Sequence, residues 1–204
     1  EVEVDGGFDG EELLIPGIME HIERAGVHSG DSISVYPPIH IEDKHKQTIL
    51  KYTYDLSKAL GVVGLVNIQF VIYDDQVYVI EVNPAPPVPF PICPRSPACP
   101  SSPWPNLRGL GSGTRISREA DYYAVQMPVF SFEKLTDVDT GLGPEMKSTG
   151  ECLGLAESFP QALLKAFKGA GMKAPKKGGR IIITVKDEDK DEMIGIARGF
   201  YDMG

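Results

Sequence analysis

The chain has 204 residues, of which 42% are hydrophobic, and this is enough to fill one large core or two small ones. Its net charge of -9 argues against a protein that follows a nucleic-acid backbone, because that task needs a basic surface. It has neither an apolar run of the roughly 20 residues that cross a bilayer nor a signal peptide, which predicts a cytoplasmic protein without membrane contacts.

The first third of the chain alternates short apolar runs with turn residues. Residues 1–4 and 13–19 are predicted strands around the turn DGGFDGE, and SGDSISVYPP adds a strand that ends at prolines. Residues 41–60 begin with acidic residues and precede a glycine, which predicts an amphipathic helix. Its expected apolar stripe comprises Ile41, Leu50, Tyr54 and Leu56. An antiparallel sheet with one helix is the prediction for this region.

The segment LVNIQFVIYDDQVYVIEV predicts a β-hairpin, because two apolar runs flank a polar turn. A three-residue turn centred on Asp75 places Gln69 opposite Glu81. The same register places Asn67 opposite Asn83, and opposed residues share one face of the sheet. A two-residue turn would shift the register and separate these pairs. The expected apolar face comprises Val66, Ile68, Phe70, Ile72, Tyr78, Ile80 and Val82.

The polar face of this hairpin has two interpretations. It is either the solvent-exposed side of an edge hairpin or a site for a hard cation. Carboxylate and amide oxygens suit magnesium, which prefers oxygen ligands and keeps places open for phosphate oxygens.

Three elements are predicted near the C-terminus. SFPQALLKAFKGAGM predicts a helix that ends at glycine, GGRIIITV predicts a buried strand, and KDEMIGIARGFYDMG predicts a second helix. A strand followed by a helix indicates the start of an α/β unit. The glycines of TGLGPEMKSTGE fit no phosphate-binding fingerprint.

Three long segments resemble the large subunit of carbamoyl-phosphate synthase: GIMEHIERAGVHSGDS, GLVNIQFVIYDDQVYVIEVNP and PVFSFEKLTDVDTGLGPEMKSTGE. The resemblance is to its second ATP-grasp unit and the passage into its methylglyoxal-synthase-like domain. It implies an α/β fold, in which the α+β C-terminal half of an ATP-grasp unit, with an antiparallel sheet, precedes a truncated Rossmann-like β-α unit. In that family the unit uses ATP to phosphorylate carbamate, giving carbamoyl phosphate for pyrimidine and arginine synthesis. The intact enzyme also has a glutaminase small subunit.

The resemblance implies roles for single residues. Gln69 and Glu81 would be ligands of magnesium or manganese, with Glu81 bridging two ions and Asn83 holding the second. The ATP-binding set would be Glu1, which holds the ribose, together with Gly26, Val27, His28, Ser29, Gln69 and Glu81. His21, Glu23 and Ser29 would lie near a potassium ion. Without the resemblance, His28 would be interpreted as an ordinary loop residue and His21 and Glu23 as surface residues.

A proline-rich segment follows the hairpin. Ten of the 17 prolines lie between Pro84 and Pro105, so no helix can form there. A polyproline linker is one interpretation. The other is a shifted reading frame, because one possible choice of codons for APPVPFPICPRSP, regrouped by one base, would encode ASRTVPYLSKVT, which resembles the family. We predict that the frame slips after Pro84 and returns before Tyr122. Ala85 then stands where the family has a phosphate-contacting arginine, which predicts that this fragment is inactive alone.

These observations predict four regions. Residues 1–84 would be the nucleotide- and metal-binding subdomain, 85–121 the anomalous segment, 122–177 a connection, and 178–204 the start of the methylglyoxal-synthase-like domain. Two other functions stay open, namely another ATP-grasp carboxylate ligase and a non-catalytic effector-binding module built around the C-terminal segment.

Overall fold

The computed structural model describes residues 1–85, 114–116, 120–132, 139–173 and 175–204. They form two compact units, residues 1–170 and residues 171–204. Most of the proline-rich segment, where the frame shift is predicted, lies outside the described residues, and the four predicted regions remain predictions. No described helix is both long and apolar enough to cross a membrane.

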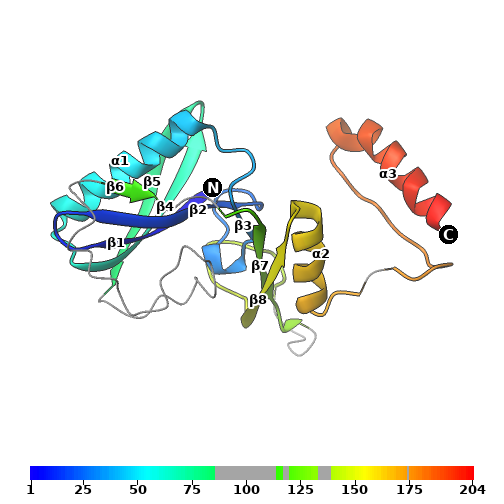
Figure 1. The fold of residues 1–204 in the computed structure, drawn as a ribbon. Helices are drawn as coiled ribbons and strands as arrows, with labels where there is room; N and C mark the ends of the chain where they lie inside the picture. Colours follow the sequence, from blue (N-terminus) through cyan, green and yellow to red (C-terminus); the bar gives the residue numbers. More distant parts are fainter. Residues whose placement is uncertain (86–113, 117–119, 133–138, 174) are drawn as a thin grey trace. The chain divides into compact units, whose positions relative to one another are not determined.

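The described residues of the first unit form one mixed sheet of eight strands, and Figure 1 shows its arrangement. Its strands are β1 (Val2–Phe8), β2 (Leu13–His21), β3 (Ser34–Tyr36), β4 (Gly64–Tyr73), β5 (Gln76–Ala85), β6 (Thr114–Ile116), β7 (Tyr123–Val129) and β8 (Gly150–Ala156). Their order is β5-β4-β1-β2-β3-β7-β8, and β6 pairs with β2 in parallel. All other pairs are antiparallel, which confirms the predicted sheet type.

The helix α1 (Asp43–Ala59) covers one face of β1 and β4. The fully buried members of this core include Val2, Val4, Phe8, Ile49, Val66, Ile68 and Phe70. The expected stripe of α1 is only partly buried, whereas its buried residues are His45, Ile49, Thr53 and Ser57, four positions apart. Two of these are hydroxyl residues, which bond the preceding turn of their own helix at 2.8 Å and 2.7 Å. Their polar groups are therefore satisfied inside the core.

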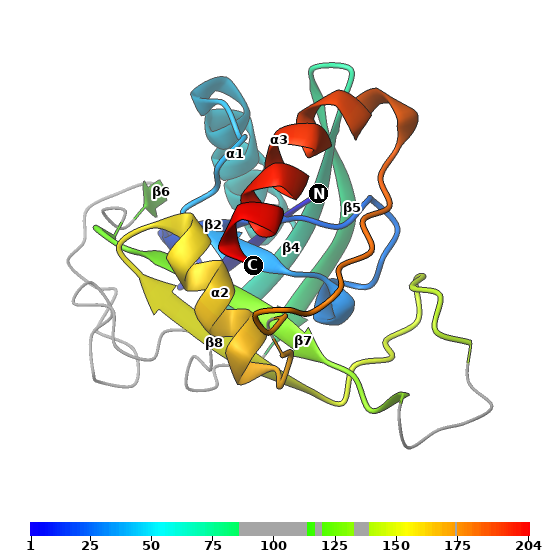
Figure 2. The ribbon, with the colours of Figure 1, turned by 90° about the vertical axis from the view of Figure 1, so that its right-hand side faces the viewer.

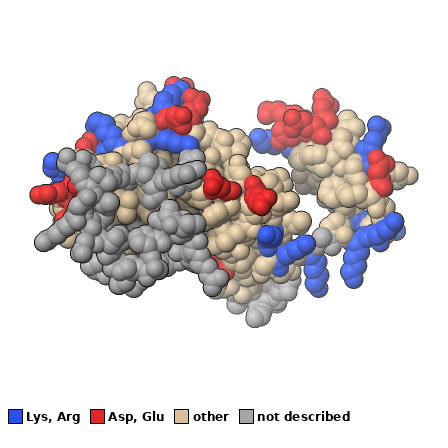
Figure 3. Space-filling model, in the orientation of Figure 1, with Lys and Arg blue, Asp and Glu red and all other residues tan. Residues whose placement is uncertain are grey.

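The start of α1 is tied to the turn between β4 and β5. His45 Nε2 lies 3.0 Å from Asp75 Oδ1, and Lys44 Nζ lies 2.5 Å from the same oxygen. Figure 3 shows both acidic and basic side chains over the outer side of α1.

The helix α2 (Phe159–Gly169) packs on β7 and β8, where Val35, Val125, Met127, Ala162 and Ala166 form a second core (Figure 2). Gly154 permits this close packing, because a Cβ at that position would meet the carbonyl of Ala162 and lie 2.6 Å from the backbone nitrogen of Ala166. The predicted helix in this region is confirmed.

The second unit contains the short 3-10 helix η3 (Asp187–Asp189) and the helix α3 (Lys190–Met203), which confirms the last predicted helix. The predicted strand GGRIIITV is wrong, since residues 180–185 form neither strand nor helix and Ile182 is 91% exposed. A strand needs a hydrogen-bonded neighbour, and the described part of residues 171–204 contains no strand that could pair with it.

Candidate metal and nucleotide site

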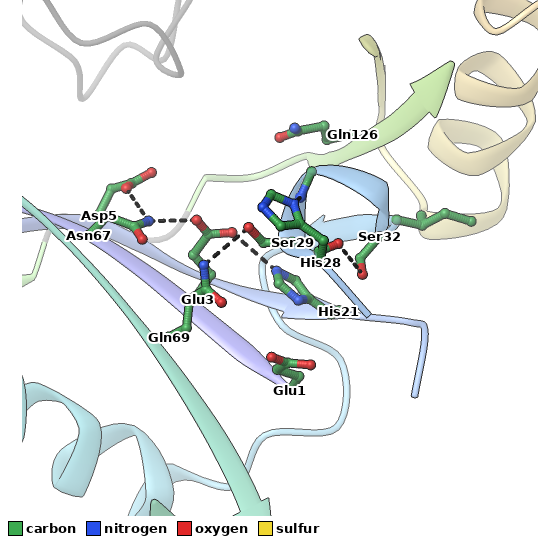
Figure 4. Close-up of polar contacts among 12 residues, drawn as sticks. Glu1, Glu3, Asp5, His21, His28, Ser29, Ser32, Asn67, Gln69 and Gln126 are labelled. Carbon is green, nitrogen blue, oxygen red and sulfur yellow. Dashed lines mark hydrogen bonds and ion pairs between the residues drawn. The ribbon is translucent and has the colours of Figure 1, made fainter. Parts of the chain in front are cut away.

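Two rows of polar side chains cross the adjacent strands β1, β4 and β5, and Figure 4 shows their members on β1 and β4. They lie on the face opposite α1, because side chains alternate between the faces of a strand. The first row is Glu3, Gln69 and Glu81, and the second row is Asp5, Asn67 and Asn83. The polar face of the hairpin is therefore extended by two carboxylates of β1, which the sequence reasoning did not single out.

The hairpin has the expected pairing, but its turn differs from the expected one. Its turn has two residues, Asp74 and Asp75, with left-handed φ values of 47° and 61°, as in a type I′ hairpin turn. That turn alone would move Glu81 away from Gln69, but the ladder shifts by one residue at Ile80 and restores the pair. The predicted three-residue turn is wrong, and the predicted pairs Gln69–Glu81 and Asn67–Asn83 are confirmed.

The bulge changes the apolar face near the turn. Tyr78 and Ile80, predicted to face the core, are 46% and 49% exposed. Val77 packs against the core instead. Side chains between the turn and the bulge have exchanged faces, as a one-residue shift requires.

Asn67 is the centre of a hydrogen-bond network. Its Nδ2 donates to Glu3 Oε1 at 2.5 Å and to Asp5 Oδ1 at 2.9 Å, and its Oδ1 accepts from Asn83 Nδ2 at 3.5 Å. Burial raises the pKa of Asp5 to about 6, although the hydrogen bond from Asn67 opposes this. Burial would also raise the pKa of Glu3, but hydrogen bonds from His21 and Asn67 outweigh it and hold that pKa below its ordinary value.

His21 is buried at the end of β2, which contradicts its interpretation as a surface residue. Its Nε2 lies 3.1 Å from Glu3 Oε2. Its Nδ1 is also buried and has no hydrogen-bond partner among the described residues. The imidazole is therefore aligned by Glu3 and keeps one ring nitrogen unused.

The loop after β2 carries the residues expected to line the nucleotide pocket. Gly26, with a left-handed φ of 91°, donates its backbone N–H to Glu1 Oε2 at 3.3 Å. The Ser29 hydroxyl accepts from Gln69 Nε2 at 3.1 Å. His28 Nδ1 accepts from the Gly30 backbone at 3.0 Å. The loop thus contacts Glu1 at one point and Gln69 at another, while the expected pocket residue Val27 is buried.

A later segment, predicted only to be part of a connection, supports this loop. Asp31 accepts hydrogen bonds from the backbone nitrogens of Lys147 and Ser148, and the His28 backbone donates to Gly143 at 2.8 Å. Burial would raise the pKa of Asp31, but the backbone donors outweigh it and lower that pKa. The partners are more than 100 positions apart, at 116 and 117, so no local pattern could reveal them.

The three residues expected near potassium have different partners. Glu23 Oε2 accepts from the Ile33 backbone at 2.6 Å, whereas His21 bonds Glu3 and Ser29 bonds Gln69. Burial raises the pKa of Glu23. In the described part of the chain, no group of three or more His, Cys, Asp or Glu side chains could hold a metal ion.

The oxygens of the hairpin suit a hard cation. The amide nitrogen of Gln69 bonds Ser29 and that of Asn83 bonds Asn67, which leaves both amide oxygens available. Glu81 is exposed beside them. One carboxylate and two amide oxygens form a donor set that magnesium or manganese accepts.

The fold is that of ATP-grasp proteins. The structure is similar to N5-carboxyaminoimidazole ribonucleotide synthetase from Thermotoga maritima, with a TM-score of 0.53 and 15% identity over 84% of this chain and 51% of that one. It is also similar to the K. lactis urea amidolyase, with a TM-score of 0.58 and 14% identity over 85% of this chain and 12% of that one.

The sequence gives the closer relationship. Residues 8–93 match the family "Carbamoyl-phosphate synthase L chain, ATP binding domain". The whole chain is 54% identical to the carbamoyl phosphate synthase large chain of Lachnoclostridium phytofermentans and 51% identical to that of Agathobacter rectalis. All of this chain is therefore related to this large chain. It spans about a fifth, 20%, of the length of these curated relatives. The expected resemblance is confirmed.

Proposed function

We propose that this chain forms the metal-binding side of an ATP-dependent phosphoryl-transfer site of the carbamoyl-phosphate synthase type. The observation that carries the proposal is the opposition of Gln69 and Glu81, with Asn83 next to them on the same face. The identity of more than half of all residues to the synthase large chain favours this family over other ATP-grasp ligases.

Gln69, Glu81 and Asn83 would hold magnesium or manganese through their side-chain oxygens. Such ions draw negative charge from a transferred phosphoryl group and align donor with acceptor. The Ser29 hydroxyl accepts from the amide nitrogen of Gln69, which directs the amide oxygen away from Ser29. The protein would contribute position and electrostatics, and no covalent step needs a side chain of this site.

The loop residues would form the nucleotide side of the site. Glu1 would accept the ribose hydroxyls, and residues 26–29 would line the pocket. The hydrogen bond between Glu1 and the Gly26 backbone joins these two parts. His28 would use Nε2 toward the nucleotide, because Nδ1 already accepts from Gly30. Potassium near His21, Glu23 and Ser29 belongs to the same proposal, and the unused buried Nδ1 of His21 lies in that region.

For the whole protein we propose the phosphorylation of carbamate to carbamoyl phosphate, in the cytoplasm and with a glutaminase small subunit as partner. The product would enter pyrimidine and arginine synthesis. This chain by itself would be inactive, because Ala85 at the end of β5 offers no guanidinium to a phosphate.

The test is binding of manganese and a fluorescent ATP analogue by the purified chain. Manganese binding is measured from the electron paramagnetic resonance signal of the free ion. We expect Glu81→Ala to abolish manganese-dependent nucleotide binding. Glu11→Ala, at an exposed carboxylate of the turn between β1 and β2, is the matched control and should bind as the parent does. Binding that is unchanged in Glu81→Ala would refute the assignment.

A further inference from the structure

The hydrogen bonds of Asn67 determine the orientation of its amide. Both N–H groups of its side chain are committed, one to Glu3 at 2.5 Å and one to Asp5 at 2.9 Å. A carboxylate can only accept, so the reversed amide would place its oxygen against two other acceptors. The Asn67 oxygen must therefore face away from β1, toward β5, where Asn83 is its cross-strand neighbour.

This orientation determines that of Asn83. Asn83 is exposed, and an exposed amide has two nearly equivalent orientations unless a neighbour selects one. Its Nδ2 donates to Asn67 Oδ1 at 3.5 Å. The Asn83 nitrogen is then bonded to Asn67, and the Asn83 oxygen is left for another partner.

Asn67 is placed in this strand by its partners and not by strand propensity, since its amide donates to the carboxylates of Glu3 and Asp5. Asparagine is disfavoured in strands compared with valine or threonine. Its neighbours on the opposite face, Val66 and Ile68, are fully apolar and buried, as a central strand requires. The polar amide is therefore matched to its partners on β1 and β5, which Figure 4 shows for Glu3 and Asp5.

We propose that Asn67 is a positioning residue. Its orientation is fixed by the acceptors Glu3 and Asp5, it fixes the orientation of Asn83 in turn, and it thereby presents the Asn83 oxygen to the divalent cation. This inference rests on the proposed function, because it requires that Asn83 is a ligand. Removing a residue that orients a ligand commonly weakens metal affinity about 10-fold, the lower end of the usual range.

The experiment is a double-mutant cycle with the dissociation constant for manganese as its measurement. Asn67→Leu removes the acceptor with little change in volume, and Asn83→Leu removes the ligand. We expect Asn67→Leu to weaken manganese binding about 10-fold in the parent chain and less than about 2-fold in the Asn83→Leu background. A purely structural role of Asn67 would weaken binding by the same factor in both backgrounds, and that result would overturn the inference.

Two further measurements separate the possible failures. Urea unfolding monitors the fold of each variant, and if Asn67→Leu does not fold, Asn67→Thr replaces it in the same cycle because threonine suits a strand. If Glu81→Ala loses binding but the cycle is additive, only the positioning role of Asn67 is refuted. If the parent chain does not bind manganese, the proposed function fails and the inference fails with it.

Discussion

Gln69 lies directly opposite Glu81 because a bulge at Ile80 offsets the register that the two-residue turn sets. Compared with a three-residue turn, the two-residue turn at Asp74 and Asp75 shifts the register by one position. The extra residue Ile80 shifts it back. The polar pairing therefore depends on the sum of turn length and bulge, and neither feature determines it alone.

Deletion of Ile80 tests this relationship. The shortened strand would run from the two-residue turn without a bulge and still place Glu81 opposite Gln69. We expect manganese affinity within about 3-fold of the parent chain, because the register of the pair is kept. Deletion of Val82 is the control, since it turns Asn83 toward the core face, and it should abolish binding. Loss of binding after deletion of Ile80 would contradict this account of the register.

Ser29→Ala should weaken metal binding without unfolding the chain. It removes the hydrogen bond that fixes the Gln69 amide, and such a bond contributes about 0.5–1.5 kcal/mol, or roughly 2- to 10-fold in affinity. Isothermal titration with manganese measures this. Ser131→Ala, which removes a hydroxyl bonded to Thr149, is the matched control and should have no effect. Equal affinities of both variants would show that Ser29 does not orient Gln69.

Asp5 should make stability depend on pH. Its pKa is raised by burial to about 6 from 3.8, so the native state holds a proton that the unfolded state has lost between these values. Stability therefore falls as pH rises from about 4 to about 6, and the cost above pH 6 is roughly 3 kcal/mol. In urea unfolding with a chelator, Asp5→Asn should be more stable than the parent at pH 7 and lack this fall. Asp43→Asn, at a side chain that is 95% exposed, controls for the loss of one charge. An unchanged slope in Asp5→Asn would contradict the assignment.

Asp31→Ala should release the segment that supports the nucleotide loop. The carboxylate bonds the backbone N–H groups of Lys147 and Ser148, and these amides should exchange with deuterium at least about 5-fold faster without it. Asp139→Ala is the control, because the Asp139 carboxylate accepts from the nearby Gly141 backbone, while its backbone carbonyl, which the substitution keeps, accepts from Lys147 Nζ. Protection of Lys147 and Ser148 that persists in Asp31→Ala would mean that another contact holds the segment.

Ala85→Arg should strengthen nucleotide binding. Ala85 ends β5 opposite Leu65, on the same face as Asn83, so a guanidinium there would reach toward a bound phosphate. A hydrogen bond to a charged group contributes about 1.5–3 kcal/mol, and we expect at least about 10-fold tighter binding of the ATP analogue. Ala85→Gln, which adds length without charge, should change affinity little. Equal effects of both substitutions would argue against a phosphate contact at this position.

Sequence reasoning succeeded where the period of a strand or helix carries the information. Alternation of polar and apolar residues in β4 and β5 identified the facing pairs Gln69–Glu81 and Asn67–Asn83. It could not show the bulge at Ile80, because a turn of three residues gives the same sum of positions. The carboxylates of Glu3 and Asp5 were also missed, since their place beside β4 depends on strand order in the sheet.

Burial of polar groups was the other source of error. In α1 the hydrophobic pattern pointed to Leu50 and Tyr54, whereas Thr53 and Ser57 are fully buried because their hydroxyls bond their own helix. His21 is a residue type that usually lies on the surface, but here it is buried and pairs with the largely buried Glu3. Residues 180–185 are apolar and β-branched, yet they form no strand, because a strand requires a partner.

The polar rows take one residue from each of three neighbouring strands. A slip of β4 or β5 by one residue would therefore turn the polar side chains of that strand away from the face where the ion is expected. Molecules in which β4 and β5 are correctly aligned would therefore bind the ion best, and binding would draw the population toward that alignment by mass action. The cation would then act as a template for assembly of the sheet as well as a participant in chemistry.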